Sequence, residues 1–267
     1  MKVVKYSGKI EEFNPEKIIG TILRAGGSKK LASEAVQEVI KNYHEGMTTK
    51  EVLNITLGFL KKEPGVPERY DLKRAIMSLG PSGFPFEIFF ASVLENYGYK
   101  TEVGEKIIGR GFVYEVDIIA EKEKKFMVEC KYHNKVGIIT KIRYAKKAYE
   151  RFLDLKSFGF NQPWLSTNTK CSYDAIEYAK NVNMKITTWT YPKTESLREL
   201  IEKKRLYPVT ILKSLKPRIK ERLYNSKILI AKDLLKYSPE ELRQKTRLPE
   251  KEIKEILRKV REVVGAD

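Results

Sequence analysis

The chain has 267 residues, of which 42% are hydrophobic and 33% are charged, so it is long enough for two or three domains with buried cores and is not a globally disordered protein. No apolar stretch reaches the length of a membrane span, the N-terminus lacks a signal-peptide core, and two cysteines with two histidines argue against a disulfide framework or a zinc site. We therefore expect a cytoplasmic protein without a membrane partner. The formal net charge of +17 favours a polyanionic partner, although the solvated, lysine-rich surface of a heat-stable protein would produce the same excess.

The first 80 residues predict a small α+β module, which we take as the first domain (1–80). Ser7 and Gly8 are a turn signal between two strand-like segments. Asn14 followed by Pro15 is typical of a helix start, because asparagine caps free backbone N–H groups and proline fits the first turn. The expected strands cover 2–6 and 9–13, and the expected helices run from Pro15 to the glycines at 26–27 and over 31–43, 49–61 and 68–79.

The opening sequence VVKYSGKIEEFNPEKI, followed by three helices and GMTTKEV, is similar to the ATP-cone domain, best known as the nucleotide-sensing module of ribonucleotide reductases. The resemblance covers about residues 1–78 and implies ATP or dATP as a regulatory ligand. Lysines would meet its phosphates as point charges, and a helix N-terminus suits an anion. A cone that has lost its ligand and a plain helical cap are the alternatives. The residues that the resemblance implies in nucleotide contact are Lys5, Glu11, Glu12, Phe13, Asn14, Lys17 and Thr49.

The glycine- and proline-rich stretch 79–83 marks the expected boundary to a second domain, which we place at 81–206. Helical and strand-like periodicities alternate along this segment. The expected helices cover 86–97, 139–158 and 172–183, and the expected strands cover 99–103, 113–120, 125–132, 162–167 and 184–190.

Residues 113–132 predict a β-hairpin, because two strands that alternate in polarity flank a charged tetrapeptide. Asp117, Glu129 and Lys131 share the face opposite the apolar set. If both apolar sets face one core, the loop is centred near Glu123 and Asp117 lies across from Glu129, with β-carbons roughly 4.5–5.5 Å apart. The apolar set comprises Tyr114, Val116, Ile118, Ala120, Phe126, Val128, Cys130 and Tyr132.

Asp117 and Glu129 form a candidate metal site. Two carboxylates at that separation repel each other unless a cation lies between them, and hard oxygen ligands of this kind suit Mg²⁺ or Mn²⁺. Lys131 points to the same side, where its ammonium could orient water or offset charge on a phosphate. The alternative is a solvated hairpin face whose acids and lysines pair for little energy, and charge alternation alone favours this alternative.

The pattern Asp-x11-Glu-Cys-Lys that begins at Asp117, with a Phe-Glu pair upstream, resembles the PD-(D/E)xK nuclease superfamily, especially its Mrr-like restriction endonuclease branch, over about residues 85–191. The resemblance implies an α/β restriction-endonuclease-like domain with a mixed sheet, and double-stranded DNA as substrate. It also implies that Asp117 and Glu129 bind the metal and that Lys131 assists the attack of water on phosphate. Glu87 matches the helical acid of the motif. The same resemblance places the basic side of the helix 139–158 near the site, with Lys141, Arg143, Lys146, Lys147 and Arg151.

The C-terminal segment, 207–267, predicts a small all-α region. Its sequence resembles tandem helix-hairpin-helix units, which implies contact with the backbone of duplex DNA without reading of its sequence. A helical interaction bundle is the alternative. The expected helices cover 209–215, 217–224, 231–235, 239–246 and 250–263.

Two functions follow from these resemblances. The first is a nucleotide-regulated, Mg²⁺-dependent DNA endonuclease of the restriction or DNA-repair type, which the intact triad of Asp117, Glu129 and Lys131 favours. The second is a non-catalytic, nucleotide-sensing DNA-binding regulator. Nucleotide on the cone could shift the arrangement of the domains or the oligomeric state, so a homo-oligomer is compatible with both functions.

Overall fold

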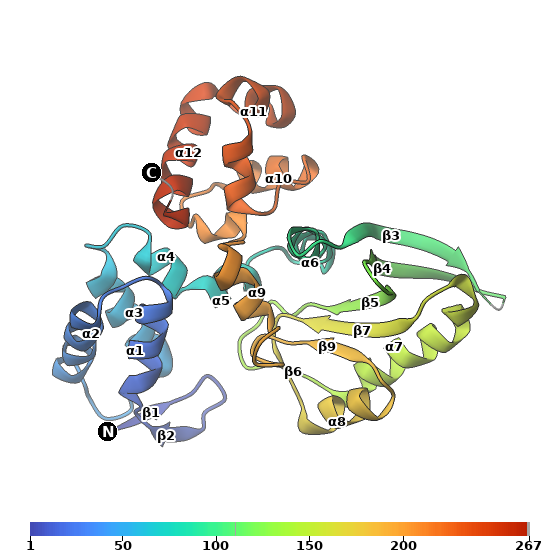
Figure 1. Ribbon diagram of the computed structural model, residues 1–267. Coiled ribbons are helices and arrows are strands. Elements are labelled where there is room, and N and C mark those ends of the chain that lie inside the picture. The colour runs from blue at the N-terminus through green and yellow to red at the C-terminus, as the bar shows by residue number, and fades with distance from the viewer. Residues whose placement is uncertain (110, 266–267) are drawn as a thin grey trace.

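The computed structural model describes residues 1–109 and 111–265 of the chain and has three parts, which Figure 1 colours from blue through green and yellow to red. The N-terminal part packs a small β-hairpin beside helices, the central part is a five-stranded sheet between helices, and the C-terminal part is helical. This arrangement confirms the predicted fold classes. Among the described residues, no helix has both the length and the apolar character needed to cross a bilayer.

The first helix begins at Pro15, as Asn14 predicts, whereas the helix expected over 31–43 begins two residues earlier, at Lys29. The Asn14 side chain accepts a hydrogen bond from the backbone N–H of Glu16 at 2.9 Å, and Thr48 and Glu51 form a reciprocal capping box. Apolar side chains on the inner helix faces, Ile22 among them, build a core of their own. The elements are β1 (Lys2–Val4) and β2 (Ile10–Glu12), which are antiparallel, followed by α1 (Pro15–Arg24), α2 (Lys29–Lys41) and α3 (Thr49–Leu60).

The single helix expected over 68–79 is instead two short helices, α4 (Val66–Tyr70) and α5 (Leu72–Met77). Asp71 lies between them with a ψ of 20°, outside the helical range. Its carboxylate is buried and forms an ion pair with Lys213 at 2.6 Å. The break therefore coincides with a contact to the far end of the chain, which local periodicity does not reveal.

The central sheet consists of β3 (Lys100–Ile108), β4 (Val113–Glu121), β5 (Lys125–Lys131), β7 (Gln162–Thr167) and β9 (Lys185–Thr187), in that order across the sheet. The first three strands are antiparallel neighbours, whereas β5, β7 and β9 run parallel. The sheet is therefore mixed, as predicted. Its parallel strands are joined by helical crossovers, which such pairs require.

Helices cover both faces of this sheet and create three layers (Figure 1). α6 (Phe84–Asn96) packs on one face, and the crossover helices α7 (Ile142–Leu155) and α8 (Tyr173–Asn181) pack on the other. Because both faces are covered, odd-numbered hairpin residues such as Ile119 and Met127 are buried as well. The prediction of one buried and one open face was therefore wrong.

The helix expected over 139–158 begins three residues later, at Ile142. Ile139–Thr140 forms a short strand, β6, which pairs in parallel with β8 (Lys170–Cys171), and the last residues, Lys156–Phe158, form a 3₁₀ turn. The helical periodicity of the segment did not reveal β6, because its pairing partner lies about thirty residues further along the chain.

The C-terminal part contains α11 (Pro239–Thr246) at the predicted bounds. The helix expected over 209–215 is only the 3₁₀ turn Val209–Ile211, and α9 (Leu197–Lys204) was not predicted. The remaining elements are α10 (Pro217–Asn225), the 3₁₀ helix Ala231–Lys236 and α12 (Glu250–Val264).

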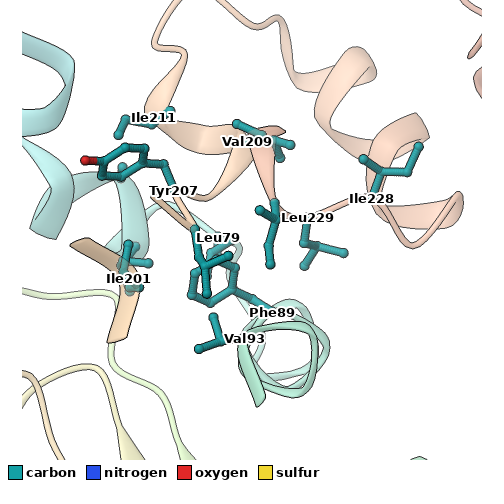
Figure 2. Packing of buried hydrophobic residues seen from close by; sticks show 14 of the residues in the cluster. Leu79, Phe89, Val93, Ile201, Tyr207, Val209, Ile211, Ile228 and Leu229 are labelled. Atoms are coloured by element: carbon teal, nitrogen blue, oxygen red, sulfur yellow. The ribbon is translucent and has the colours of Figure 1, made fainter. Parts of the chain in front are cut away.

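One hydrophobic core joins the sheet to the C-terminal helices. Figure 2 shows Phe89 and Val93 of α6 beside Leu79, with Ile201 and Leu229 nearby from later parts of the chain, and all five are buried. α6 is therefore held between the sheet and the C-terminal helices, which stabilises the position of every side chain it carries.

A half-buried arginine, Arg69, joins the N-terminal and C-terminal parts. The guanidinium of Arg69 donates to the carbonyl of Ala25 at the end of α1 at 2.7 Å, and to those of Val263 at 2.8 Å and Glu262 at 3.3 Å near the end of α12. Helix C-termini leave carbonyls unpaired and carry partial negative charge, so one cation serves both ends. Gly65, four residues earlier, lies against the Glu262 carbonyl.

We expect Gly65→Ala to destabilise the protein more than Gly46→Ala. Both glycines have a left-handed φ, +74° and +80°, which costs alanine about 1–2 kcal/mol. A Cβ at Gly65 would also collide with the Glu262 backbone, whereas one at Gly46 meets nothing within 4 Å, so the first variant should lose a further 1–3 kcal/mol, roughly. Urea unfolding followed by circular dichroism measures both, and equal losses would contradict the close approach of α12.

Candidate functional site

Asp117 lies at a bend in β4. At this bend the even-numbered residues of the strand switch from the α7 face of the sheet to the α6 face. Before it, Tyr114 and Val116 pack in the cluster on the α7 face; after it, Ile118 belongs to the cluster on the α6 face. The pairing with β3 omits Gly104 and Asp117, although residues on either side are paired, and Gly104 has a left-handed φ of +73°. The single apolar face predicted for the even-numbered residues was therefore wrong, because the bend divides them between two faces.

Asp117 and Glu129 lie next to the last pair of the hairpin ladder. The ladder between β4 and β5 runs from Glu121–Lys125 to Ile118–Val128, so the turn is centred at Glu123 as predicted, and the pairing ends one residue before Asp117 and Glu129. Beyond the last pair, Asp117 Oδ2 accepts a hydrogen bond from the backbone N–H of Cys130 at 2.7 Å. This bond holds the Asp117 carboxylate at the open end of the hairpin.

Four acids interact at this end of the hairpin. Burial, followed by the like charges of Asp117, Glu115 and Glu129, raises the pKa of Glu87 to about 7. Burial and the charge of Asp117 raise the pKa of Glu129 to about 7, and burial raises the pKa of Asp117. Glu115 itself is exposed. The acids proposed from the sequence, Glu87, Asp117 and Glu129, are thus close enough to repel one another.

Two cations belong to the site, Arg151 on α7 and Lys131 at the end of β5. Arg151 forms an ion pair with Glu129 Oε2 at 2.5 Å and donates to the backbone carbonyl of Glu115 at 3.1 Å. The Lys131 ammonium lies 4.6 Å from the centre of the Tyr144 ring, and in the described part of the chain it makes no ion pair. Sequence reasoning missed Tyr144, and it treated Arg151 only as one basic residue of a helix side.

Asp117 and Glu129 fit a hard divalent cation. Within residues 1–109 and 111–265, no group of three or more histidine, cysteine or acidic side chains is arranged as a ready-made metal cage. Mg²⁺ does not need one, because it retains several waters and is commonly held by one or two carboxylates together with substrate phosphates. The repulsion that raises the pKa of these acids is what such a cation would relieve.

A second candidate site is a cavity of about 250 Å³ in the N-terminal part, between the β-hairpin and α1, α3 and α4. Of the seven residues implied in nucleotide contact, Glu11, Glu12, Phe13, Asn14, Lys17 and Thr49 line it, whereas Lys5 does not. Lys5 instead forms an ion pair with Glu11, whose second oxygen lies 3.3 Å from the Lys17 ammonium; these cations lower the pKa of Glu11. Sequence reasoning missed Thr21 and Tyr70, which also line the cavity.

The comparisons with known protein families divide the chain into three segments. The family model of the ATP cone domain matches residues 1–70, the restriction endonuclease model matches 80–198, and the model of the C-terminal region of AF1548-like proteins matches 207–264. The predicted fusion of an ATP cone to an Mrr-like restriction endonuclease domain is therefore confirmed. The helix-hairpin-helix resemblance of the last segment stays a prediction.

Individual relatives come from the same archaeon. An uncharacterized protein of Archaeoglobus fulgidus is 35% identical over 176 residues, which are 66% of this chain and 99% of that protein. A second uncharacterized protein of that organism is 44% identical over 46 residues, 17% of this chain and 98% of its own length. The crystal structure of AF1548, a protein of unknown function, is 33% identical with a TM-score of 0.64 and covers 70% of this chain and 100% of its own.

The charge of Glu87 should oppose folding of the metal-free protein. Its folded-state pKa of about 7 lies above the ordinary 4.5, so the penalty is absent below about pH 4.5, grows between the two values and is complete above pH 7. We expect Glu87→Gln to raise Tm by a few degrees at about pH 8 in EDTA, and the gain to fade as the pH approaches 4.5. Thermal denaturation measures this effect. The exposed control Glu63→Gln should leave Tm unchanged, and a gain that persists at low pH would contradict the charge explanation.

Proposed function

The chain belongs to the family of the protein AF1548 and joins an ATP cone to a restriction endonuclease domain, and from this premise we propose that it is a nucleotide-regulated endonuclease. In this proposal the enzyme depends on Mg²⁺ or Mn²⁺ and hydrolyses phosphodiester bonds of double-stranded DNA. One observation carries the proposal. Asp117 and Glu129 lie on neighbouring strands at the open end of one hairpin, where Asp117 accepts a hydrogen bond from the backbone N–H of Cys130, the residue after Glu129.

Each residue of the site has a distinct task in this proposal. Asp117 and Glu129 would hold the divalent cation, which supplies Lewis acidity toward phosphate oxygens. The backbone N–H of Cys130 fixes one Asp117 oxygen and leaves the other for the cation. Lys131, whose ammonium has no carboxylate partner in the described residues, would stabilise charge that develops on the scissile phosphate. Glu87 adds negative charge that strengthens cation binding.

The large positive charge of the chain supports DNA as the substrate. A net charge of +17 attracts the phosphate backbone and makes binding salt-dependent. The basic residues of α7 lie on the helix that contacts the carboxylates, so part of this charge is next to the scissile position. We assign the nuclease role rather than that of a non-catalytic regulator, because a regulator would not need buried acids opposed to one another.

The ATP cone supplies the regulatory half of the proposal. Lys17 and Thr21 line the cavity from α1, and the next turn of the same helix carries Arg24, which donates to Thr21 at 3.0 Å. Arg24 lies 3.6 Å from the carboxylate of Glu202 on α9, a helix whose core is shared with α6. ATP or dATP in the cavity would alter the nuclease through this helix if the two arrangements of the parts bind nucleotide with different affinity.

Cleavage of duplex DNA tests the nuclease assignment. We expect the wild type to cut with Mg²⁺ or Mn²⁺ and not in EDTA. Asp117→Asn, Glu129→Gln and Lys131→Ala should each lower the rate at least about a hundredfold, because the first two weaken the hold on the cation and the third removes a positive charge from the phosphate. Gel assays on linear and supercoiled DNA measure the rate, and electrophoretic mobility shifts show that DNA binding persists. If the wild type binds DNA but cuts no substrate, the regulator is the correct function.

Calorimetric titration with ATP and dATP tests the cone. Lys17→Ala should weaken binding about tenfold, because it removes one charge-assisted contact to phosphate, whereas Lys30→Ala on the exposed side of α2 should not change it. Equal affinities in all three proteins would exclude this cavity as the nucleotide site, and the same titrations repeated in the presence of DNA would reveal the coupling.

A further inference from the structure

Three residues of α7 share one face of that helix. Tyr144, Lys147 and Arg151 are separated by three and four residues, the spacing that aligns side chains along an α-helix. The helix is fixed against the sheet by Ala145 and Ala148, both 0% exposed, so the shared face has a defined direction. On this face Tyr144 contacts Lys131 and Arg151 contacts Glu129.

Arg151 acts on Glu129. Its side chain is 18% exposed and that of Glu129 is 17% exposed, so the ion pair at 2.5 Å is largely shielded from solvent. The same nitrogen donates to the Glu115 carbonyl at 3.1 Å, which ties the guanidinium to the backbone of β4 as well as to a side chain of β5. The planar guanidinium has fixed donor directions, so the two contacts together set its orientation. It engages Oε2 of Glu129 and leaves Oε1 for another partner.

Tyr144 acts on Lys131. The ammonium lies 4.6 Å from the ring centre, within the range of a cation–π contact. The ring is itself bordered by the guanidinium of Arg143 at 4.9 Å and by the His133 ring at 6.3 Å, so its position is supported from two sides. The contact holds Lys131 and leaves its positive charge in place. A carboxylate partner would neutralise that charge.

Lys147 lies between these two on the same face of α7 and is exposed, so this face carries a second positive charge beside Arg151.

We propose that this face of α7 positions two side chains of the active site. Arg151 orients Glu129 so that its free oxygen can take the metal, and Tyr144 places the Lys131 ammonium for the phosphate. The assignment rests on the proposed nuclease function. Outer partners of this kind set the direction of a ligating carboxylate, and their loss commonly lowers metal affinity or activity by about 10–100-fold.

Metal binding tests Arg151 without any cleavage. Mn²⁺ affinity measured by electron paramagnetic resonance should fall about 10–100-fold in Arg151→Gln, recover in part in Arg151→Lys, and stay unchanged in Lys180→Gln, whose side chain makes a surface ion pair on α8. Tighter binding in Arg151→Gln would overturn the proposal, because Arg151 would then be a competitor of the metal. Unchanged binding would overturn it as well, and circular dichroism confirms that each variant is folded.

Single-turnover cleavage tests Tyr144. Tyr144→Leu should slow cleavage about three- to thirtyfold with DNA affinity unchanged, and Tyr144→Phe, which keeps the ring, should recover most of that loss. Tyr173→Leu, at a residue 79% exposed on α8, is the control. Equal rates for the leucine and phenylalanine variants would overturn the ring contact. If the wild type cuts no DNA, the nuclease function fails, and the Mn²⁺ measurements still decide the role of Arg151.

Discussion

The shared burial of Glu87, Asp117 and Glu129 is the constraint on which the site depends. Removal from water raises the pKa of all three carboxyl groups, and the charge of Asp117 adds to this effect at Glu87 and Glu129. A fold keeps such a cluster only if other contacts fix the groups, and here the Cys130 N–H and the Arg151 guanidinium do so. The remaining excess of negative charge is the feature that makes a divalent cation part of the expected working state.

The architecture brings three separate elements to this cluster. The hairpin supplies Asp117 and Glu129, α6 supplies Glu87, and α7 supplies Arg151. α6 and α7 lie on opposite faces of the sheet, and α6 is also packed against the C-terminal helices (Figures 1 and 2). Side chains from both faces can meet only where the pairing of the strands is interrupted or ends. Asp117 lies at such an interruption, together with Gly104 of β3, whose φ is left-handed.

Local features of this structure were predictable from the sequence, and contacts between distant segments were not. The hairpin register, with its turn centred at Glu123, follows from polarity and turn length, which are local, and so does the Asn14 cap. The bend at Asp117 depends on the backbone of Gly104 in another strand. The sequence around Tyr144 does not distinguish an aromatic ring that contacts a lysine from one that packs in the core. Only the helical spacing of Tyr144 from Lys147 and Arg151 offered a signal.

Contacts of the N-terminal part with α9 and α12 connect the cone to the restriction endonuclease domain. α1 lines the cavity proposed for the nucleotide with Lys17, ends at the carbonyl that Arg69 binds, and reaches Glu202 through Arg24. A nucleotide that moves α1 therefore acts on two joints together, one to α12 and one to α9. Both helices share the core that contains α6 and its neighbours, so a shift at either joint is transmitted to the element that carries Glu87. Packed cores respond to such shifts by moving between discrete arrangements, which suits a regulated enzyme better than gradual deformation.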